Sequence, residues 1–218
     1  MNPNRFKALR DALTAEATHA ESLVSIDNGE QLQVEGSIVR RIIDFPEARQ
    51  ATSFTCGAAA VQAVLYYYGD EWREDQLRQA LGIQPDGLGV EPDVIEAFLR
   101  RKGYNVESGE MTIEELRGYV DRNVPVIVVM QAWNEAYRQR DVDYSGYVDG
   151  HYIVTIGYTD DAIIFEDPSI MSNRGYLLDE ELDARWHDET ETGERMNRYG
   201  IAVFGQSAFD RRRVLKIR

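Results

Sequence analysis

Hydrophobic and polar positions divide the chain into a helix-rich first half and a strand-rich second half. Apolar residues recurring every three or four positions indicate helices, and short runs rich in β-branched residues indicate strands. The predicted helices cover 4–25, 56–68, 74–81, 92–103, 112–123 and 179–186. The predicted strands cover one or two segments within 31–45, then 104–107, 125–132, 151–159, 162–166, 199–205 and 214–217.

The segment 56–68 has almost no polar face, so we expect it to be a buried central helix. Because most helices precede most strands, the order favours an α+β fold with a mostly antiparallel sheet rather than alternating β-α-β units. We expect a helical extension over 1–34, followed by one globular domain over 35–218. The polar segments 133–150 and 189–198 have no clear period and are interpreted as loops.

The net charge of the chain disfavours some classes of binding partner. The formal net charge is −14, which disfavours binding to phosphate backbones or anionic lipid, so neither nucleic acid nor a membrane is expected as a partner. The acidic, Lys-poor composition fits a salt-adapted protein or a solubilised surface encoded by a GC-rich genome. Basic residues near the N-terminus are followed by no apolar block, and we therefore expect a cytoplasmic protein.

The chain contains one cysteine, Cys56, which excludes a disulfide framework and a Cys-rich metal site; no cofactor is expected. A lone cysteine is more often a small buried hydrophobe than a nucleophile. Cys56, however, comes directly before Gly57 at the predicted start of the central helix. Free N–H groups and the helix dipole at such a position favour the thiolate, which is the reactive form.

A thiolate nucleophile needs a base, and the chain offers three histidines. His19 is expected to be solvated in the first helix, and His187 to be a surface or packing residue in a charged segment. His151 begins an apolar strand, so its ring is expected at the rim of the sheet. Asp167 ends the returning strand of the same predicted hairpin, so antiparallel pairing would bring it to His151 as an orienting carboxylate. Either residue could instead be structural, with Asp167 marking a turn before a proline.

Gln50 lies six residues before Cys56 and is a candidate donor to an oxyanion, beside the backbone N–H of Cys56. On its own it could equally be a surface glutamine.

Taken together, these segments resemble a known family. The sequence QATSFTCGAA, at 50–59, looks like the nucleophile motif of the C39 peptidases and C39-like proteins. The segments GHYIV, at 150–154, and EDPS, at 166–169, resemble their His strand and Asp-Pro turn. The similarity spans about residues 35–205, and 174–188 is similar to the tail of free-standing members. Thr55 departs from the Asp that many relatives carry.

The resemblance implies a papain-like cysteine peptidase fold and assigns four roles: Cys56 nucleophile, His151 general base and acid, Asp167 orienting group, and Gln50 oxyanion donor. The expected function is cleavage of a peptide or amide bond through an acyl-enzyme, with a peptide or amide as partner. A cysteine-dependent acyltransferase, similar to transglutaminases or phytochelatin synthase, and a non-catalytic peptide-binding module remain alternatives. The loop 133–150 precedes His151 and is expected to border the cleft. The sequence does not indicate the oligomeric state.

Overall fold

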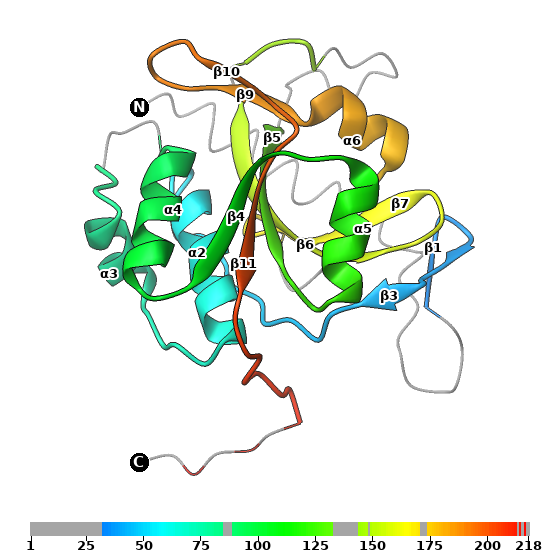
Figure 1. The fold of residues 1–218 in the computed structure, drawn as a ribbon, viewed down its shortest axis with the longest axis horizontal. Coiled ribbons are helices and arrows are strands. Elements are labelled where there is room, and N and C mark those ends of the chain that lie inside the picture. The colour runs from blue at the N-terminus through cyan, green and yellow to red at the C-terminus, as the bar shows by residue number, and fades with distance from the viewer. Residues whose placement is uncertain are drawn as a thin grey trace.

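The structure is a computed structural model that describes residues 32–84, 89–132, 144–147, 149–170 and 174–212, with 214 and 216. A central antiparallel sheet has helices on both sides (Figure 1). The helices are α2 (Cys56–Tyr67), α3 (Glu74–Ala80), α4 (Pro92–Arg101), α5 (Ile113–Asp121) and α6 (Asp179–Arg185). The predicted α+β class is confirmed, whereas the predicted helix over 4–25 and nearly all of the 1–34 extension lie outside the described residues.

The sheet has seven strands in the order β4-β11-β5-β6-β7-β8, with β3 paired to β6. Their bounds are β3 (Arg41–Ile42), β4 (Asn105–Glu110), β5 (Val126–Gln131), β6 (Gly150–Tyr158), β7 (Ala162–Glu166), β8 (Gly175–Leu178) and β11 (Tyr199–Phe204). Every pairing among these strands is antiparallel. Two small hairpins flank the sheet: β1 (Gln33–Val34) with β2 (Ser37–Ile38), and β9 (His187–Glu189) with β10 (Arg195–Asn197).

Alternating side chains of the strands supply two apolar clusters on opposite faces of the sheet. On β6, Val154 belongs to the cluster that includes α2, and the neighbouring Ile153 belongs to the cluster that includes α6. Helix α2 packs on β6, and all its residues except Tyr66 are buried. The prediction of a buried central helix is therefore confirmed, and this burial fixes the start of α2 against β6.

The structure differs from the sequence prediction in four places. The segment 189–198, predicted as a loop, contains much of the β9–β10 hairpin, and β8 was not predicted. Both segments lack a fully buried face, so they carry little of the alternation that reveals a half-buried strand. The region 31–45 forms three two-residue strands, because Glu35 and Gly36 turn the chain with positive φ. Of the predicted strand 214–217, only 214 and 216 are described, and neither lies in a strand.

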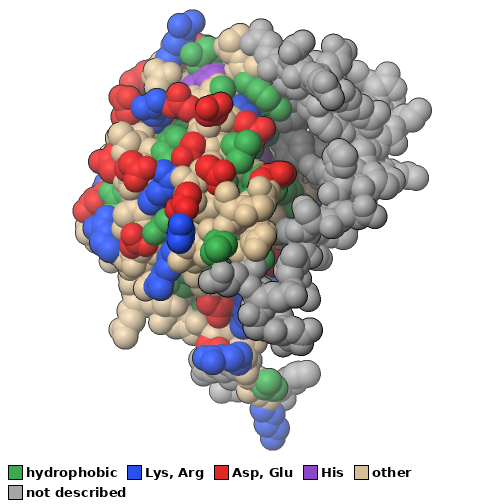
Figure 2. Space-filling model, turned by 90° about the vertical axis from the view of Figure 1, so that its right-hand side faces the viewer, with side chains coloured by type: hydrophobic (Ala, Val, Ile, Leu, Met, Phe, Trp, Pro, Cys, Tyr) green, Lys and Arg blue, Asp and Glu red, His purple; other side chains and the backbone are tan. Residues whose placement is uncertain are grey.

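The outer surface carries the charge that the composition indicated. Figure 2 shows acidic side chains spread over the described part of one face, interspersed with Lys and Arg. In the described ranges, no helix combines the length and apolar character needed to cross a bilayer.

Candidate active site

Cys56 is the first residue of α2 and is 8% exposed. The turn before it is held by Thr55, whose hydroxyl accepts from Thr52 N–H at 3.1 Å and donates to Thr52 O at 3.2 Å. Thr55 is fully buried and makes no side-chain cap to α2. The sulfur therefore lies at a helix start whose backbone N–H groups are not covered by the preceding side chain.

Gly57 allows the chain to approach the sheet closely at this point. A Cβ atom on residue 57 would lie 2.5 Å from Val90 Cγ1 and 3.1 Å from the Tyr152 ring. Tyr152 is itself fixed, because its hydroxyl donates to Val90 O at 2.8 Å. A larger residue at 57 would thus push α2, and Cys56 with it, away from β6.

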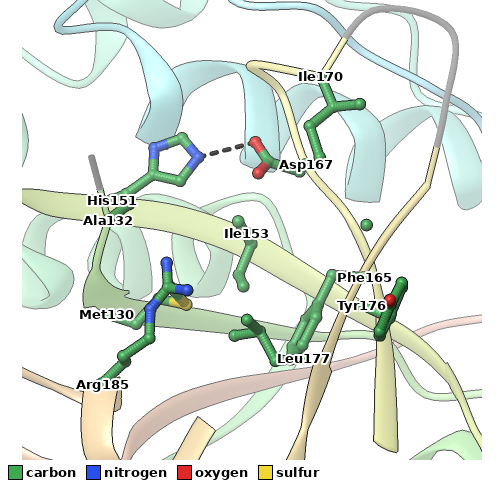
Figure 3. Close-up of a pocket in the computed structure, with 11 residues that line it drawn as sticks. Met130, Ala132, His151, Ile153, Phe165, Asp167, Ile170, Tyr176, Leu177 and Arg185 are labelled. Atoms are coloured by element: carbon green, nitrogen blue, oxygen red, sulfur yellow. Dashed lines mark hydrogen bonds and ion pairs between the residues drawn. The ribbon is translucent and has the colours of Figure 1, made fainter. Parts of the chain in front are cut away.

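His151 is 2% exposed and is the second residue of β6, where it pairs with Met130 of β5. Asp167 follows the last residue of β7 directly. The two side chains meet, with His151 Nε2 2.8 Å from Asp167 Oδ1 (Figure 3). His151 also makes a side-chain hydrogen bond to the Cys56 thiol.

The expected hairpin forms, but His151 and Asp167 are not directly opposed in its register. Val154 pairs with Glu166, and an irregularity between Thr155 and Gly157 shifts the pairing nearer the turn. Asp167 therefore reaches His151 diagonally from beyond the end of β7. The orientation of the Asp167 carboxylate is fixed by the turn that follows it. In this turn Ser169 donates to Asp167 Oδ1 from its backbone N–H at 2.8 Å and from its hydroxyl at 2.6 Å.

The pKa values of Cys56, His151 and Asp167 are shifted by burial and by the charges and hydrogen bonds among the three residues. Burial raises the pKa of the Cys56 thiol, but the hydrogen bond and charge of His151, with the backbone N–H groups of Tyr152 and Gly57, outweigh it and lower the pKa overall. Burial opposes protonation of His151, yet the Asp167 charge and the Cys56 thiolate raise its pKa. Burial likewise raises the pKa of Asp167, and His151 and Ser169 bring it below its ordinary value. These shifts favour a thiolate beside an imidazolium.

Gln50 lies on the segment between β3 and α2, next to the Asp167 turn. Its backbone N–H donates to Pro168 O at 3.0 Å, and its side-chain Nε2 donates to Thr52 O at 2.8 Å. Its Oε1 is buried and accepts no hydrogen bond from any described residue. The structure thus connects Gln50 both to the turn that carries Asp167 and to the turn before Cys56.

Glu166 was missed by the sequence reasoning. Glu166 is 4% exposed, and its Oε1 accepts from Ala48 N–H at 3.0 Å. Its Oε2 is buried and has no hydrogen-bond partner in the ranges that the structure describes. Burial, together with the charges of Asp167 and Glu47, raises its pKa to about 8. The only sequence signal was an acidic residue ending an otherwise apolar strand.

The other candidates lie apart from this arrangement or outside the described residues. His187 is half-buried in β9, and its Nε2 contacts Gly146 O at 3.1 Å. His19 and residues 133–143 of the expected cleft loop lie outside the described residues. Within the described ranges, no group of three His, Cys, Asp or Glu side chains could hold a metal ion.

Comparison with known proteins identifies the family and the fold. Residues 42–193 match the profile of the Peptidase_C39 like family. A comparison with curated proteins found no match.

Solved structures are similar in fold. A C39-like peptidase from Bacillus anthracis is 17% identical with a TM-score of 0.58, over 77% of this chain and 99% of that one. The peptidase domain of Streptococcus ComA, a bi-functional ABC transporter involved in quorum sensing, is 19% identical with a TM-score of 0.53, over 76% and 98%. A double glycine motif protease from an AMS/PCAT transporter, solved with its leader peptide, is 18% identical with a TM-score of 0.52, over 75% and 94%.

These likenesses confirm the predicted papain-like fold. Because the family profile covers well over half of the sequence, the chain belongs to the Peptidase_C39 like family.

Proposed function

We propose that the protein is a cysteine peptidase or amide hydrolase in which Cys56, His151 and Asp167 act as a catalytic triad. The observation that carries the proposal is the buried chain of contacts from the Cys56 thiol to His151 and from His151 Nε2 to Asp167 at 2.8 Å. A nucleophile held by a base that is itself oriented by a third group is the arrangement that acyl transfer requires. Family membership and the peptidase folds of the similar structures support the same chemistry.

In the first step, the Cys56 thiolate attacks the carbonyl carbon of a peptide or amide bond. The tetrahedral intermediate collapses as His151 gives its proton to the leaving amine, which forms a thioester on Cys56. His151 then takes a proton from water as the water attacks the thioester. A carboxylic acid leaves, and the ion pair of Cys56 and His151 is restored.

The oxyanion of the intermediate needs donors near the start of α2. The backbone N–H of Cys56 and the side-chain amide of Gln50 are the proposed pair. An amide nitrogen carries two hydrogens, and the bond to Thr52 O uses one of them. The second is available for the oxyanion.

The test is to expose the protein to a peptide library and sequence the new termini by mass spectrometry. We expect cleavage by the wild-type chain, none by Cys56→Ala or His151→Ala, and near wild-type cleavage by His187→Ala, the matched control on β9. Cleavage that survives Cys56→Ala would refute the proposal. An acyl group found on Cys56 by intact mass after rapid acid quench would identify the intermediate directly.

A further inference from the structure

A pocket of about 170 Å³ lies beside the His151–Asp167 pair, on the face of the sheet opposite α2. Figure 3 shows His151 and Asp167 at one end, and Ile153, Phe165 and Leu177 along the walls. An apolar cavity of about 150 Å³ can hold benzene, so this pocket can take a group of similar size. It is large enough for a short side chain or a chain terminus.

Arg185 is the one cationic side chain among the described residues that line the pocket, apart from His151. It is the last residue of α6, and its guanidinium is directed toward the end where His151 lies (Figure 3). Its Nε donates to Gln131 O at 3.0 Å, and the guanidinium carbon lies 4.3 Å from the centre of the Tyr144 ring. These two contacts hold the side chain in place.

Among the described residues, no carboxylate lies within ion-pair distance of Arg185, and the charges of Glu181 and Asp167 act on it only from further away. No ion pair involves it, and its terminal nitrogens make no hydrogen bond to a described residue. Burial lowers the pKa of Arg185 by more than the nearby charges of Glu181 and Asp167 raise it, so the guanidinium is incompletely compensated within the protein. Arginines that are withdrawn from water are normally paired, and a guanidinium fork fits a carboxylate in two-point contact.

We propose that this pocket binds a carboxylate on a short apolar stem, with Arg185 as the residue that recognises it. The apolar walls would cover the stem, and the guanidinium terminus would pair with the charge. Because the pocket adjoins the His151–Asp167 pair, and resting on the proposed peptidase function, the carboxylate belongs to the substrate near the bond that is cleaved. It is either an acidic side chain or a free C-terminus.

The selectivity would be local, since the chain as a whole has a net charge of −14 and repels anions. Its acidic surface would by itself favour basic or neutral peptides. Asp167 also lines the pocket, but its carboxylate is paired with His151 at 2.8 Å. The guanidinium of Arg185 can therefore discriminate between a carboxylate and an amide at this site, although the surface as a whole disfavours anions.

The first experiment measures binding of benzoate and its neutral isostere benzamide to the full chain by NMR titration. We expect wild-type protein to bind benzoate about tenfold or more tightly than benzamide, as a charge-assisted contact implies. Shift changes should appear at the methyl groups of Ile153 and Leu177. Arg185→Gln should abolish the preference. Arg195→Gln, which removes another arginine that lies over a tyrosine ring, should keep it.

Equal binding of the two probes, or a preference that survives Arg185→Gln, would overturn the proposal. Arg185→Lys retains the charge without the fork and should keep a reduced preference, so it serves if Arg185→Gln fails to fold. Alkylation of Cys56 in each variant reports whether the nucleophile is intact, independently of the pocket.

The second experiment uses peptide pairs that differ as Glu against Gln, or as free against amidated C-terminus. In one of the two pairs, the peptide that carries the carboxylate should be cleaved faster than its neutral counterpart, and benzoate should inhibit that cleavage. The pair that shows this difference identifies the source of the carboxylate as a side chain or a C-terminus. Cleavage that benzoate and Arg185→Gln leave unchanged would overturn the assignment to substrate while leaving the peptidase function standing.

Discussion

Replacing Glu166 by Gln should stabilise the protein, increasingly so as the pH rises. In the folded protein the pKa of Glu166 is raised from 4.5 to about 8, first by burial and then by the charges of Asp167 and Glu47. The unfolded chain releases this proton near pH 4.5, whereas the folded protein holds it up to about pH 8. Between these values the unfolded state binds fewer protons, so stability falls as the pH rises.

The size of the effect follows from the difference between the two pKa values. At pH 7 the pH lies about 2.5 units above the pKa of Glu166 in the unfolded chain. At 1.36 kcal/mol per unit, ionisation of the unfolded chain lowers the free energy of unfolding by roughly 3 kcal/mol at pH 7 and by about 5 kcal/mol above pH 8. Gln is neutral in both states and avoids this loss. Its amide oxygen can still accept from Ala48 N–H, as Glu166 Oε1 does at 3.0 Å.

Thermal unfolding measured from about pH 5 to pH 9 tests this reasoning. Glu166→Gln should melt only about 2–3 °C higher near pH 5 but roughly 6–12 °C higher at pH 7, given ~2–4 °C per kcal/mol for a chain of this size. Glu71→Gln, at an exposed position in the loop before α3, makes the same change in formal charge and is the control. A difference that is independent of pH, or a less stable Glu166→Gln protein at pH 8, would refute the account.

Three further substitutions test the site. Gly57→Ala should lower the free energy of unfolding by about 1–3 kcal/mol, because the new Cβ would lie 2.5 Å from a methyl carbon. The control Gly118→Ala, on helix α5 with nothing within 4 Å of the new Cβ, should raise it by roughly 0.5–1 kcal/mol. Urea unfolding measures both free energies, and equal effects would contradict the packing argument. Asp167→Asn should lower the pKa of His151 and move the alkaline limb of the pH–rate profile to lower pH; an unmoved limb would count against the ion pair. Gln50→Ala should lower kcat about 10²–10³-fold while thiol alkylation continues at the wild-type rate, and unchanged kcat would remove it from the oxyanion site.

The sequence predicted the elements that are buried and regular. The segment 56–68 has almost no polar face, and α2 packs against the sheet with all its residues buried except Tyr66. The strands around His151 were predicted because their apolar runs are continuous, and the structure gives them as the buried β6 and β7. Apolar patterns of this strength predict buried elements well, because burial of apolar surface is the dominant favourable contribution to folding.

The parts that were missed depend on contacts between distant segments. The β9–β10 hairpin has Met196 as the one apolar side chain of its two strands, so it lacks the alternation by which a strand is recognised. The diagonal approach of Asp167 depends on an irregularity near Thr155, which no sequence pattern marked. Arg185 was passed over because a pocket formed by β5, β6, β8 and α6 exists only after the sheet has formed.

The central claim is that Cys56 is a thiolate activated by His151, and the pH dependence of its alkylation tests this most directly. Because the chain has one cysteine, intact mass after timed reaction with iodoacetamide reports on Cys56 alone. The account predicts that the rate in the folded protein rises with a midpoint clearly below about pH 8.5, the value for a free thiol, and that denaturant or His151→Ala removes the shift. A midpoint equal to that of the unfolded chain, or a folded thiol that does not react at neutral pH, would contradict it.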